Sequence, residues 1–151
     1  MKQSALKYAL YLLEMRDRSE AEIRKKMTEK EYLAEEIDKT ILWLKDKKFI
    51  DDERFVDNYL KLQAGIGKSG RYKIKFKLQN LGIDRELIEE KLAGIDPDIE
   101  FDQAHTLTEK WLARKEIPKE KKYEKVGRFL AGRGYSLDIV HKVLNSIIHN
   151  S

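Results

Sequence analysis

Apolar residues along this chain follow one spacing that occurs three times. Each occurrence has six apolar residues separated by steps of 4, 5, 5, 4 and 3 positions. The three sets are Ile23, Met27, Tyr32, Ile37, Ile41 and Leu44; then Ile74, Leu78, Ile83, Ile88, Leu92 and Ile95; then Val126, Leu130, Tyr135, Val140, Leu144 and Ile147. Steps of three and four place residues on one face of a helix. The spacing therefore indicates an internal repeat built from helices.

The two steps of five indicate a turn between two helices. In the second and third copies the turn has the sequences Gly82-Ile83-Asp84 and Gly134-Tyr135-Ser136. Glycine adopts the left-handed conformation that ends a helix, and Asp or Ser caps the next one. The first copy has Glu31-Tyr32-Leu33 instead, so we expect a looser turn there.

A further helical segment precedes each of these helix pairs. Apolar residues keep helical spacing over 5–13, 55–60 and 104–111, and this places Tyr8, Tyr59 and Trp111 at equivalent core positions. Ser19 to Glu22 forms a capping box, and Asp51-Asp52 supplies a helix N-cap. We therefore predict an all-α fold of three tandem three-helix repeats.

The predicted repeats span residues 1–50, 51–95 and 98–148. Asp96-Pro97-Asp98 is the clearest boundary, because proline disfavours helix in the residue before it. The longest loop is expected over 114–122, which includes Pro118. Repeats of about 50 residues are marginal alone and gain stability by stacking, so we expect an elongated, curved rod.

The composition agrees with an extended helical chain and excludes several classes of protein. Charged residues make up 38% of the sequence, above the usual roughly 25%, which implies much solvated surface per core. The absence of cysteine excludes a disulfide framework and a thiolate metal site. No apolar run is long enough for a signal peptide or a membrane span, so we expect a cytoplasmic protein.

Positive charge is concentrated in the middle of the chain. No acidic residue lies between Asp57 and Asp84. The basic residues in that interval are Lys61, Lys68, Arg71, Lys73, Lys75 and Lys77. Such a segment attracts polyanions or acidic protein surfaces. A solvated helix face is an equally good interpretation from charge alone.

The segment "GIGKSGRYKIKFK", residues 65–77, imitates two nucleotide-binding motifs. A dinucleotide loop requires a preceding strand, but "DERFVDNYLKLQA" has helical spacing. A P-loop requires glycine at position 62, which is Leu62. Neither motif therefore has the sequence context that its chemistry needs. The glycines are instead predicted to form a flexible joint between two helices.

The alternation that follows the glycines is compatible with a basic strand, but the repeat favours a helix. Ile74 and Leu78 occupy the positions of Ile23 and Met27, whose segment "EAEIRKKM" has no strand character. On a helix, Lys73 and Lys77 share one face, and Arg71 and Lys75 share another. Tyr72 and Phe76 lie among these cations, where they could stack on bases or pack on a neighbouring helix.

No catalytic or metal-binding constellation is present in the sequence. His105, His141 and His149 lack a partner of the H-E-x-x-H type. Asp51-Asp52 is better explained as a cap than as an acid-base pair, and no serine has an activating partner placed by sequence. We therefore expect neither enzymatic activity nor a cofactor.

Four segments together resemble the RecX family, regulatory proteins of the recombinase RecA. They are "RSEAEIRKKM", "FIDDERFVDNYL", "KIKFKLQNLGI" and "RFLAGRGYSLDIV", and the resemblance runs from about Ala5 to Ile147. It implies an all-helical repeat protein of bacteria that binds the RecA filament on single-stranded DNA, along the filament groove. It also implies that the protein mainly inhibits filament extension, ATP hydrolysis and strand exchange, and in some members binds DNA directly.

The resemblance also suggests which residues to test. The family's acidic turn matches Asp51, Asp52, Arg54 and Phe55, and its late element matches residues 133–135. Relatives tend to carry arginine before the glycines, whereas residues 63–67 contain none. The candidate filament-binding or DNA-binding residues are Lys68, Arg71, Lys73, Lys75, Lys77, Arg24, Lys25, Arg128 and Arg133.

Three functions remain open at this stage. The first is a monomeric, non-catalytic regulator of the RecA filament. The second is a helix-turn-helix module that binds single- or double-stranded DNA without regulating a recombinase; the acidic segment "DRELIEEK" argues against it. The third is a helical scaffold for an unrelated acidic partner.

Overall fold

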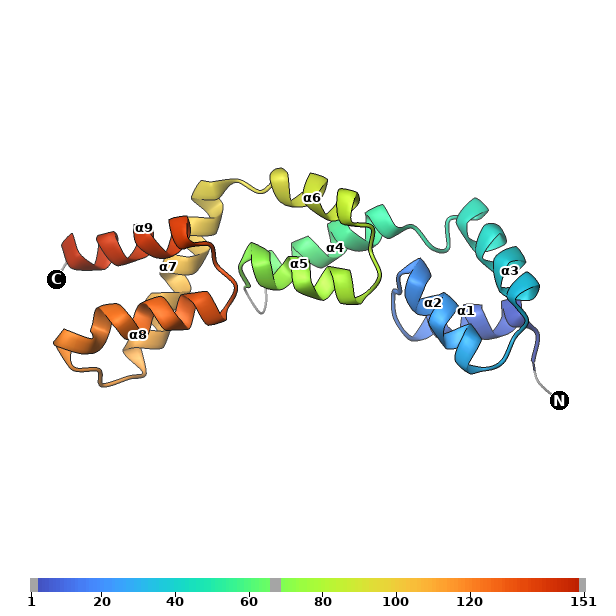
Figure 1. The fold of residues 1–151 in the computed structure, drawn as a ribbon, viewed down its shortest axis with the longest axis horizontal. Coiled ribbons are helices and arrows are strands. Elements are labelled where there is room, and N and C mark those ends of the chain that lie inside the picture. The colour runs from blue at the N-terminus through green and yellow to red at the C-terminus, as the bar shows by residue number, and fades with distance from the viewer. Residues whose placement is uncertain (1–2, 66–68, 150–151) are drawn as a thin grey trace. The chain divides into compact units, whose positions relative to one another are not determined.

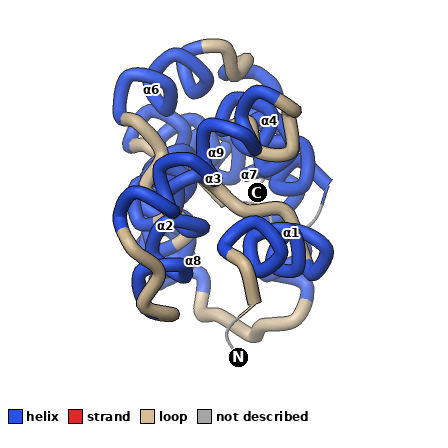
Figure 2. Tube along the Cα trace, turned by 90° about the vertical axis from the view of Figure 1, so that its right-hand side faces the viewer, coloured by secondary structure: helices blue, strands red, loops and turns tan. Residues whose placement is uncertain are grey.

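The computed structural model describes residues 3–65 and 69–149, which form nine α-helices and no strand (Figures 1 and 2). The helices are α1 (Ala5–Met15), α2 (Glu20–Glu29), α3 (Ala34–Asp46), α4 (Asp52–Gly65), α5 (Arg71–Asn80), α6 (Arg85–Ala93), α7 (Pro97–Ala113), α8 (Lys119–Gly132) and α9 (Leu137–His149). The all-α prediction is confirmed. Because α5 is helical and follows helix α4, the strand interpretation of residues 72–78 is excluded.

The chain forms two compact units. The N-terminal unit comprises Met1–Tyr59 and Leu78–Ile88, and the C-terminal unit comprises Leu60–Lys77 and Glu89–Ser151. The border between them runs within α4, α5 and α6. The limits of the three predicted repeats therefore stay a prediction.

The core of the N-terminal unit lies among α1, α2 and α3. Its most enclosed side chains are Ala9, Ile23, Met27, Ile41 and Leu44. Tyr8 is 7% exposed and its ring stacks on Tyr32 at a centroid distance of 5.7 Å. The prediction that Tyr8 is a core residue is confirmed.

The turn in the first copy is as tight as the other two, so the prediction of a looser turn is wrong. Tyr32 N donates to Met27 O at 3.1 Å, and the equivalent bonds from Ile83 N and Tyr135 N are 3.1 and 3.2 Å. Glu31 takes the left-handed conformation, with φ 66°, that Gly82 and Gly134 take in the other copies. A non-glycine residue there costs about 1–2 kcal/mol. Burial of Tyr32, whose hydroxyl donates to Gln3 O at 2.6 Å, offsets that cost.

Several helix starts agree with the sequence prediction. Ser19 Oγ accepts from Glu22 N at 3.1 Å, and Glu22 Oε1 accepts from Ser19 N at 3.2 Å, which completes the capping box. Asp51 Oδ1 accepts from Arg54 N at 3.2 Å and caps α4. At the Asp-Pro-Asp boundary, Asp96 caps α7, which begins at Pro97.

The loop before α8 is shorter than predicted. It spans only residues 114–118, because α8 begins at Lys119 rather than after Lys122. Pro118 is the N-cap residue, and its carbonyl oxygen accepts from Lys121 N at 2.9 Å. Proline fits this position because it lies ahead of the helix, where its missing N–H removes no helical hydrogen bond.

The core of the C-terminal unit lies among α7, α8 and α9, which Figure 1 shows side by side. Ala104, Val126, Leu130 and Val143 are fully buried in it. The half-buried ring of Trp111 stacks on Phe129 at a centroid distance of 4.4 Å. This contact agrees with the packing role that the repeat predicts for Trp111.

Asp52 caps a helix other than its own, which the sequence did not predict. Its Oδ1 accepts from Glu20 N, at the start of α2, at 2.9 Å. Burial raises the pKa of the Asp52 carboxyl, and the hydrogen bond from Glu20 N opposes that rise. The folded state therefore favours the protonated carboxyl relative to the unfolded chain.

We expect the Asp52→Asn variant to be more stable than the unmodified chain at neutral pH. The amide oxygen still accepts from Glu20 N, and no charge is buried. A carboxyl with a raised pKa contributes stability at low pH that is lost as pH rises. Urea unfolding from about pH 3 to pH 7 should show the variant's advantage growing with pH. An advantage that is constant over this range would contradict the prediction.

Candidate interaction surface

Helix α5 carries the most concentrated positive charge among the described helices. Its first seven residues include Arg71, Lys73, Lys75 and Lys77 and no acidic residue. Ile74 is 5% exposed and Leu78 is fully buried, so the helix turns a narrow apolar stripe inward. The four cations lie around the rest of the helix, and their surroundings differ.

Arg71 is held in an ion pair inside the C-terminal unit. Its Nε lies 3.2 Å from Glu100 Oε2, and its Nη2 donates to Glu100 Oε1. Glu100 is only 6% exposed. The hydrogen bonds to Glu100 raise the pKa of Arg71. This guanidinium therefore balances a buried carboxylate and is less available to a partner than the sequence implies.

Lys75 also has an acidic neighbour. Its Nζ lies 3.6 Å from Glu89 Oε1, on helix α6. Glu89 is 52% exposed at its side chain, and ion pairs of this kind contribute at most about 1 kcal/mol. Lys75 can leave this pair at little cost, but its charge is partly balanced.

Lys73 and Lys77 form the open part of the basic surface. Both are exposed, and neither has an ion-pair partner within residues 3–65 and 69–149. Their spacing of four places them on one face of α5, as predicted. Tyr72 and Phe76 make a second exposed pair with the same spacing, at 61% and 66% exposure. Phe76 is thus not packed on a neighbouring helix, and we call these four residues the α5 face.

Backbone contacts with the α8–α9 turn fix the start of α5. Gly70 N donates to Arg133 O at 2.8 Å, and Tyr72 N donates to Gly134 O at 3.0 Å. A Cβ on Gly70 would overlap the backbone of Gly134. The flexible-joint prediction is therefore wrong for Gly70, which permits close packing. Gly67 lies outside the described residues.

The other candidate residues differ in their surroundings. Arg24 lies between Glu20 and Asp38, at 3.1 and 2.8 Å, and the hydrogen bond to Asp38 raises its pKa. Arg128 is exposed but lies 2.7 Å from Glu124.

The guanidinium of Arg133 lies over the Phe129 ring, 5.2 Å from its centroid, in a cation–π contact. Lys25 is exposed without an ion-pair partner among the described residues. Lys68 lies outside the described residues. The structure therefore brings together the α5 members of the predicted set and the backbone of Arg133, which contacts the start of α5.

Lys25 also borders a polar pocket in the N-terminal unit that the sequence did not indicate. Arg16, Arg18 and Lys26 contribute further positive charge to a volume of about 510 Å³. Arg18 is 7% exposed and its Nε donates to Leu12 O at 3.2 Å. Arg16 lies 2.6 Å from a Glu22 oxygen. Two carboxylates, Glu22 and Glu29, also line this pocket and would compete with an added anion for these cations.

Two absences can be stated for the described residues. They contain no group of three or more His, Asp or Glu side chains that could hold a metal ion. None of their helices is long and apolar enough to cross a membrane.

Three family models match consecutive parts of the chain. They describe the first, second and third three-helix domains of RecX, and they match residues 5–44, 51–92 and 98–144. The chain belongs to the RecX family. The resemblance proposed from the sequence is confirmed.

Curated relatives with the name "Regulatory protein RecX" match most of the chain. The relative from Clostridium tetani is 35% identical over 145 residues, which cover 94% of this chain and 66% of the relative. The relative from Pasteurella multocida is 37% identical over 136 residues, covering 89% and 82%. The chain thus spans about two thirds of the length of the clostridial relative. These relatives are regulatory proteins by name.

Two solved RecX structures have the same fold. RecX from Lactobacillus salivarius superposes with a TM-score of 0.85 at 24% identity, covering 94% of this chain and 93% of that one. A second structure, of regulatory protein RecX, gives 0.82 at 23% identity, covering 93% and 70%. At these sequence identities the two superpositions show similarity of the fold alone.

The second RecX domain contributes residues to both compact units. In the N-terminal unit, Ser19 Oγ of the first domain donates to Leu81 O of the second at 2.6 Å. In the C-terminal unit, Gly70 of the second domain donates to Arg133 of the third. The second RecX domain therefore makes specific contacts with both of its neighbours in sequence.

Proposed function

We propose that this chain is a monomeric, non-catalytic regulator that binds the RecA filament on single-stranded DNA. It lies along the filament groove and mainly inhibits filament extension, ATP hydrolysis and strand exchange. Membership of the RecX family supports the regulatory role. The proposal of binding rests on the α5 face. Its two ammonium groups and two aromatic rings are exposed and have no acidic neighbour on α5.

Electrostatics favours this face over the other candidate cations. Arg71, Arg24 and Arg128 already have carboxylate partners, so a new anion would have to compete with them. Lys73 and Lys77 have no such competitor on their helix, and a positive surface raises association rates with an anionic partner. Tyr72 and Phe76 add apolar contact area, which residues of this type provide at interaction sites.

We expect the chain to lower the rate of ATP hydrolysis by RecA on single-stranded DNA when it is substoichiometric to RecA. The Lys73→Glu/Lys77→Glu variant should require about tenfold more protein for the same inhibition, equivalent to ~1.4 kcal/mol. The measurement is a titration of the ATPase rate at fixed RecA and DNA. Unchanged hydrolysis at micromolar concentrations of the unmodified chain would refute the proposal.

A matched control distinguishes an effect of the α5 face from an effect of the total charge of the chain. Lys121 and Lys125 are exposed on α8 with the same spacing of four and no ion-pair partner in the described residues. The Lys121→Glu/Lys125→Glu variant has the same change in net charge and should inhibit normally. Equal loss in both double variants would mean that the α5 face has no special role.

The alternative is direct DNA binding without recombinase regulation, which the exposed rings of Tyr72 and Phe76 also favour. It predicts tight binding to a labelled oligo-dT in the absence of RecA, and an affinity that falls steeply with salt. Tight binding together with an unchanged ATPase rate would favour this alternative.

A further inference from the structure

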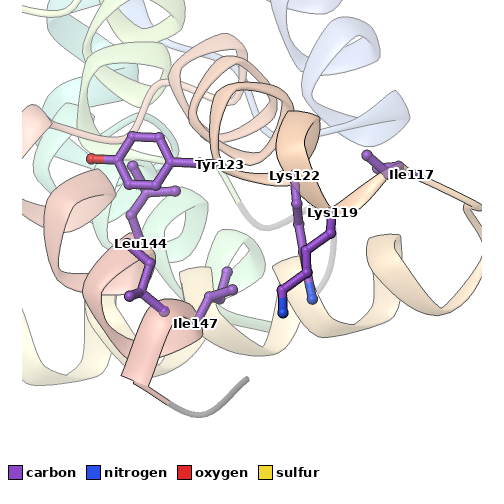
Figure 3. Close-up of a pocket in the computed structure, with 7 residues that line it drawn as sticks. Ile117, Lys119, Lys122, Tyr123, Leu144 and Ile147 are labelled. Carbon is purple, nitrogen blue, oxygen red and sulfur yellow. The ribbon is translucent and has the colours of Figure 1, made fainter.

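A pocket of about 500 Å³ lies at the start of α8 and the end of α9, within the C-terminal unit (Figure 3). One wall is formed by Leu144 and Ile147 on α9 and by Tyr123 on α8. Ile117, from the loop before α8, and Ile148 complete its apolar lining. This volume is in the range of pockets that hold ligands.

The apolar lining is accessible from solvent at its edge. Ile148 is 51% exposed and Tyr123 is also 51% exposed, whereas Leu144 is 4% exposed at the base. Exposed apolar side chains next to a concave apolar base are typical of a surface that a partner covers. None of these residues takes part in the α5 face.

The remaining lining residues are two lysines. Lys119 and Lys122 extend side by side from α8, and their ammonium groups lie at the same edge of the pocket (Figure 3). Neither has an ion-pair partner in the described part of the chain, and no acidic residue lines the pocket. Two neighbouring positive charges without a counter-charge attract an anionic group.

We propose that this pocket binds an acidic segment of another protein through one inserted apolar side chain. The side chain lies against Leu144 and Ile147, and carboxylates beside it pair with Lys119 and Lys122. Charge complementarity selects an acidic partner. The aliphatic base selects an apolar side chain over a nucleobase, because it offers few hydrogen-bonding groups to a base edge.

The pocket is separate from the contact that holds α5. Arg133, which accepts the hydrogen bond from Gly70, follows the last residue of α8, whereas Lys119 is the first residue of that helix. With 14 residues in α8 and a rise of about 1.5 Å per residue, the two ends are roughly 20 Å apart. The pocket can therefore be occupied while the α5 face is engaged, and the two proposals can fail independently.

The test uses the full chain and a fluorescein-labelled peptide with four aspartates around one phenylalanine. Fluorescence anisotropy should show saturable binding, and Lys119→Glu/Lys122→Glu should weaken it by about tenfold or more. The matched control is Lys121→Glu/Lys125→Glu, since these lysines lie on the same helix but do not line the pocket. This control should bind the peptide normally.

A second pair of measurements tests the apolar contact. Ile148→Ala should weaken binding without unfolding the chain, because this side chain is half exposed. A peptide with alanine in place of phenylalanine should bind several-fold more weakly to the unmodified chain. The proposal is overturned if the peptide does not bind, if both lysine variants lose binding equally, or if the alanine peptide binds as well. Displacement of the peptide from the unmodified chain by oligo-dT, together with loss of direct oligo-dT binding in Lys119→Glu/Lys122→Glu, would also overturn it, in favour of a nucleic-acid site.

Discussion

The Arg71→Met variant is expected to be less stable than the unmodified chain by ~3 kcal/mol at neutral pH. The change leaves the Glu100 carboxylate, which is 6% exposed, without the guanidinium that now pairs with it. Removal of one partner from a buried pair costs about 3–5 kcal/mol. The Arg71 side chain is 30% exposed, so water reaches part of the site and the lower end of that range applies. Urea unfolding at pH 7 measures the change.

The Arg71→Met/Glu100→Gln double variant is the control for this prediction. It removes both charges, so no isolated charge stays in the interior, and we expect it to recover most of the lost stability. If Arg71→Met unfolded at the same urea concentration as the unmodified chain, the pair would have no structural role. Arg71 would then return to the set of residues available to a partner.

The helices and their cores could be predicted because local sequence determines them. Ile74 and Leu78 are buried as their match to Ile23 and Met27 indicates. The same comparison assigned α5 as a helix despite its alternating pattern. Caps at Ser19 and Asp51 depend on neighbours within a few residues, which a sequence displays directly.

Long-range partners could not be predicted in this way. Arg71 pairs with a carboxylate 29 positions away, and the Asp52 oxygen accepts from an N–H 32 positions away. Local spacing puts Arg71 and Lys73 on different faces of the helix, but it does not show that Arg71 pairs with a buried carboxylate while Lys73 has no such partner. The candidate cations could therefore be listed from the sequence, but the folded structure was needed to identify which of them are open and form the α5 face.

The roles of the glycines, too, could be predicted only in part from local sequence. Gly82 and Gly134 were predicted to end helices, and their φ values of 78° and 88° agree. Glu31 takes the same conformation without being glycine, because burial of the next residue stabilises the turn. Gly70 has a different role, which only its proximity to Gly134 explains.

The Gly134→Ala variant should be less stable by ~2–4 kcal/mol, from two effects that add. Gly134 has φ 88°, a conformation that strains a residue with a side chain by about 1–2 kcal/mol. The new Cβ would also come within 2.5 Å of Lys73 N and Cβ. To relieve that overlap, the turn must move away from the start of α5 and lengthen the hydrogen bond from Tyr72 N to Gly134 O.

Gly132→Ala is the matched control, two positions earlier at the end of α8. A Cβ there meets nothing within 4 Å, and alanine is favoured over glycine in a helix by about 0.5–1 kcal/mol. We expect this variant to be as stable as the unmodified chain or slightly more stable in urea unfolding. Equal stability of the two alanine variants would show that the α8–α9 turn can move away from the start of α5 without a loss of stability. The α5 face would then not be held by the third RecX domain, and its orientation could not depend on the contact between Gly70 and Arg133.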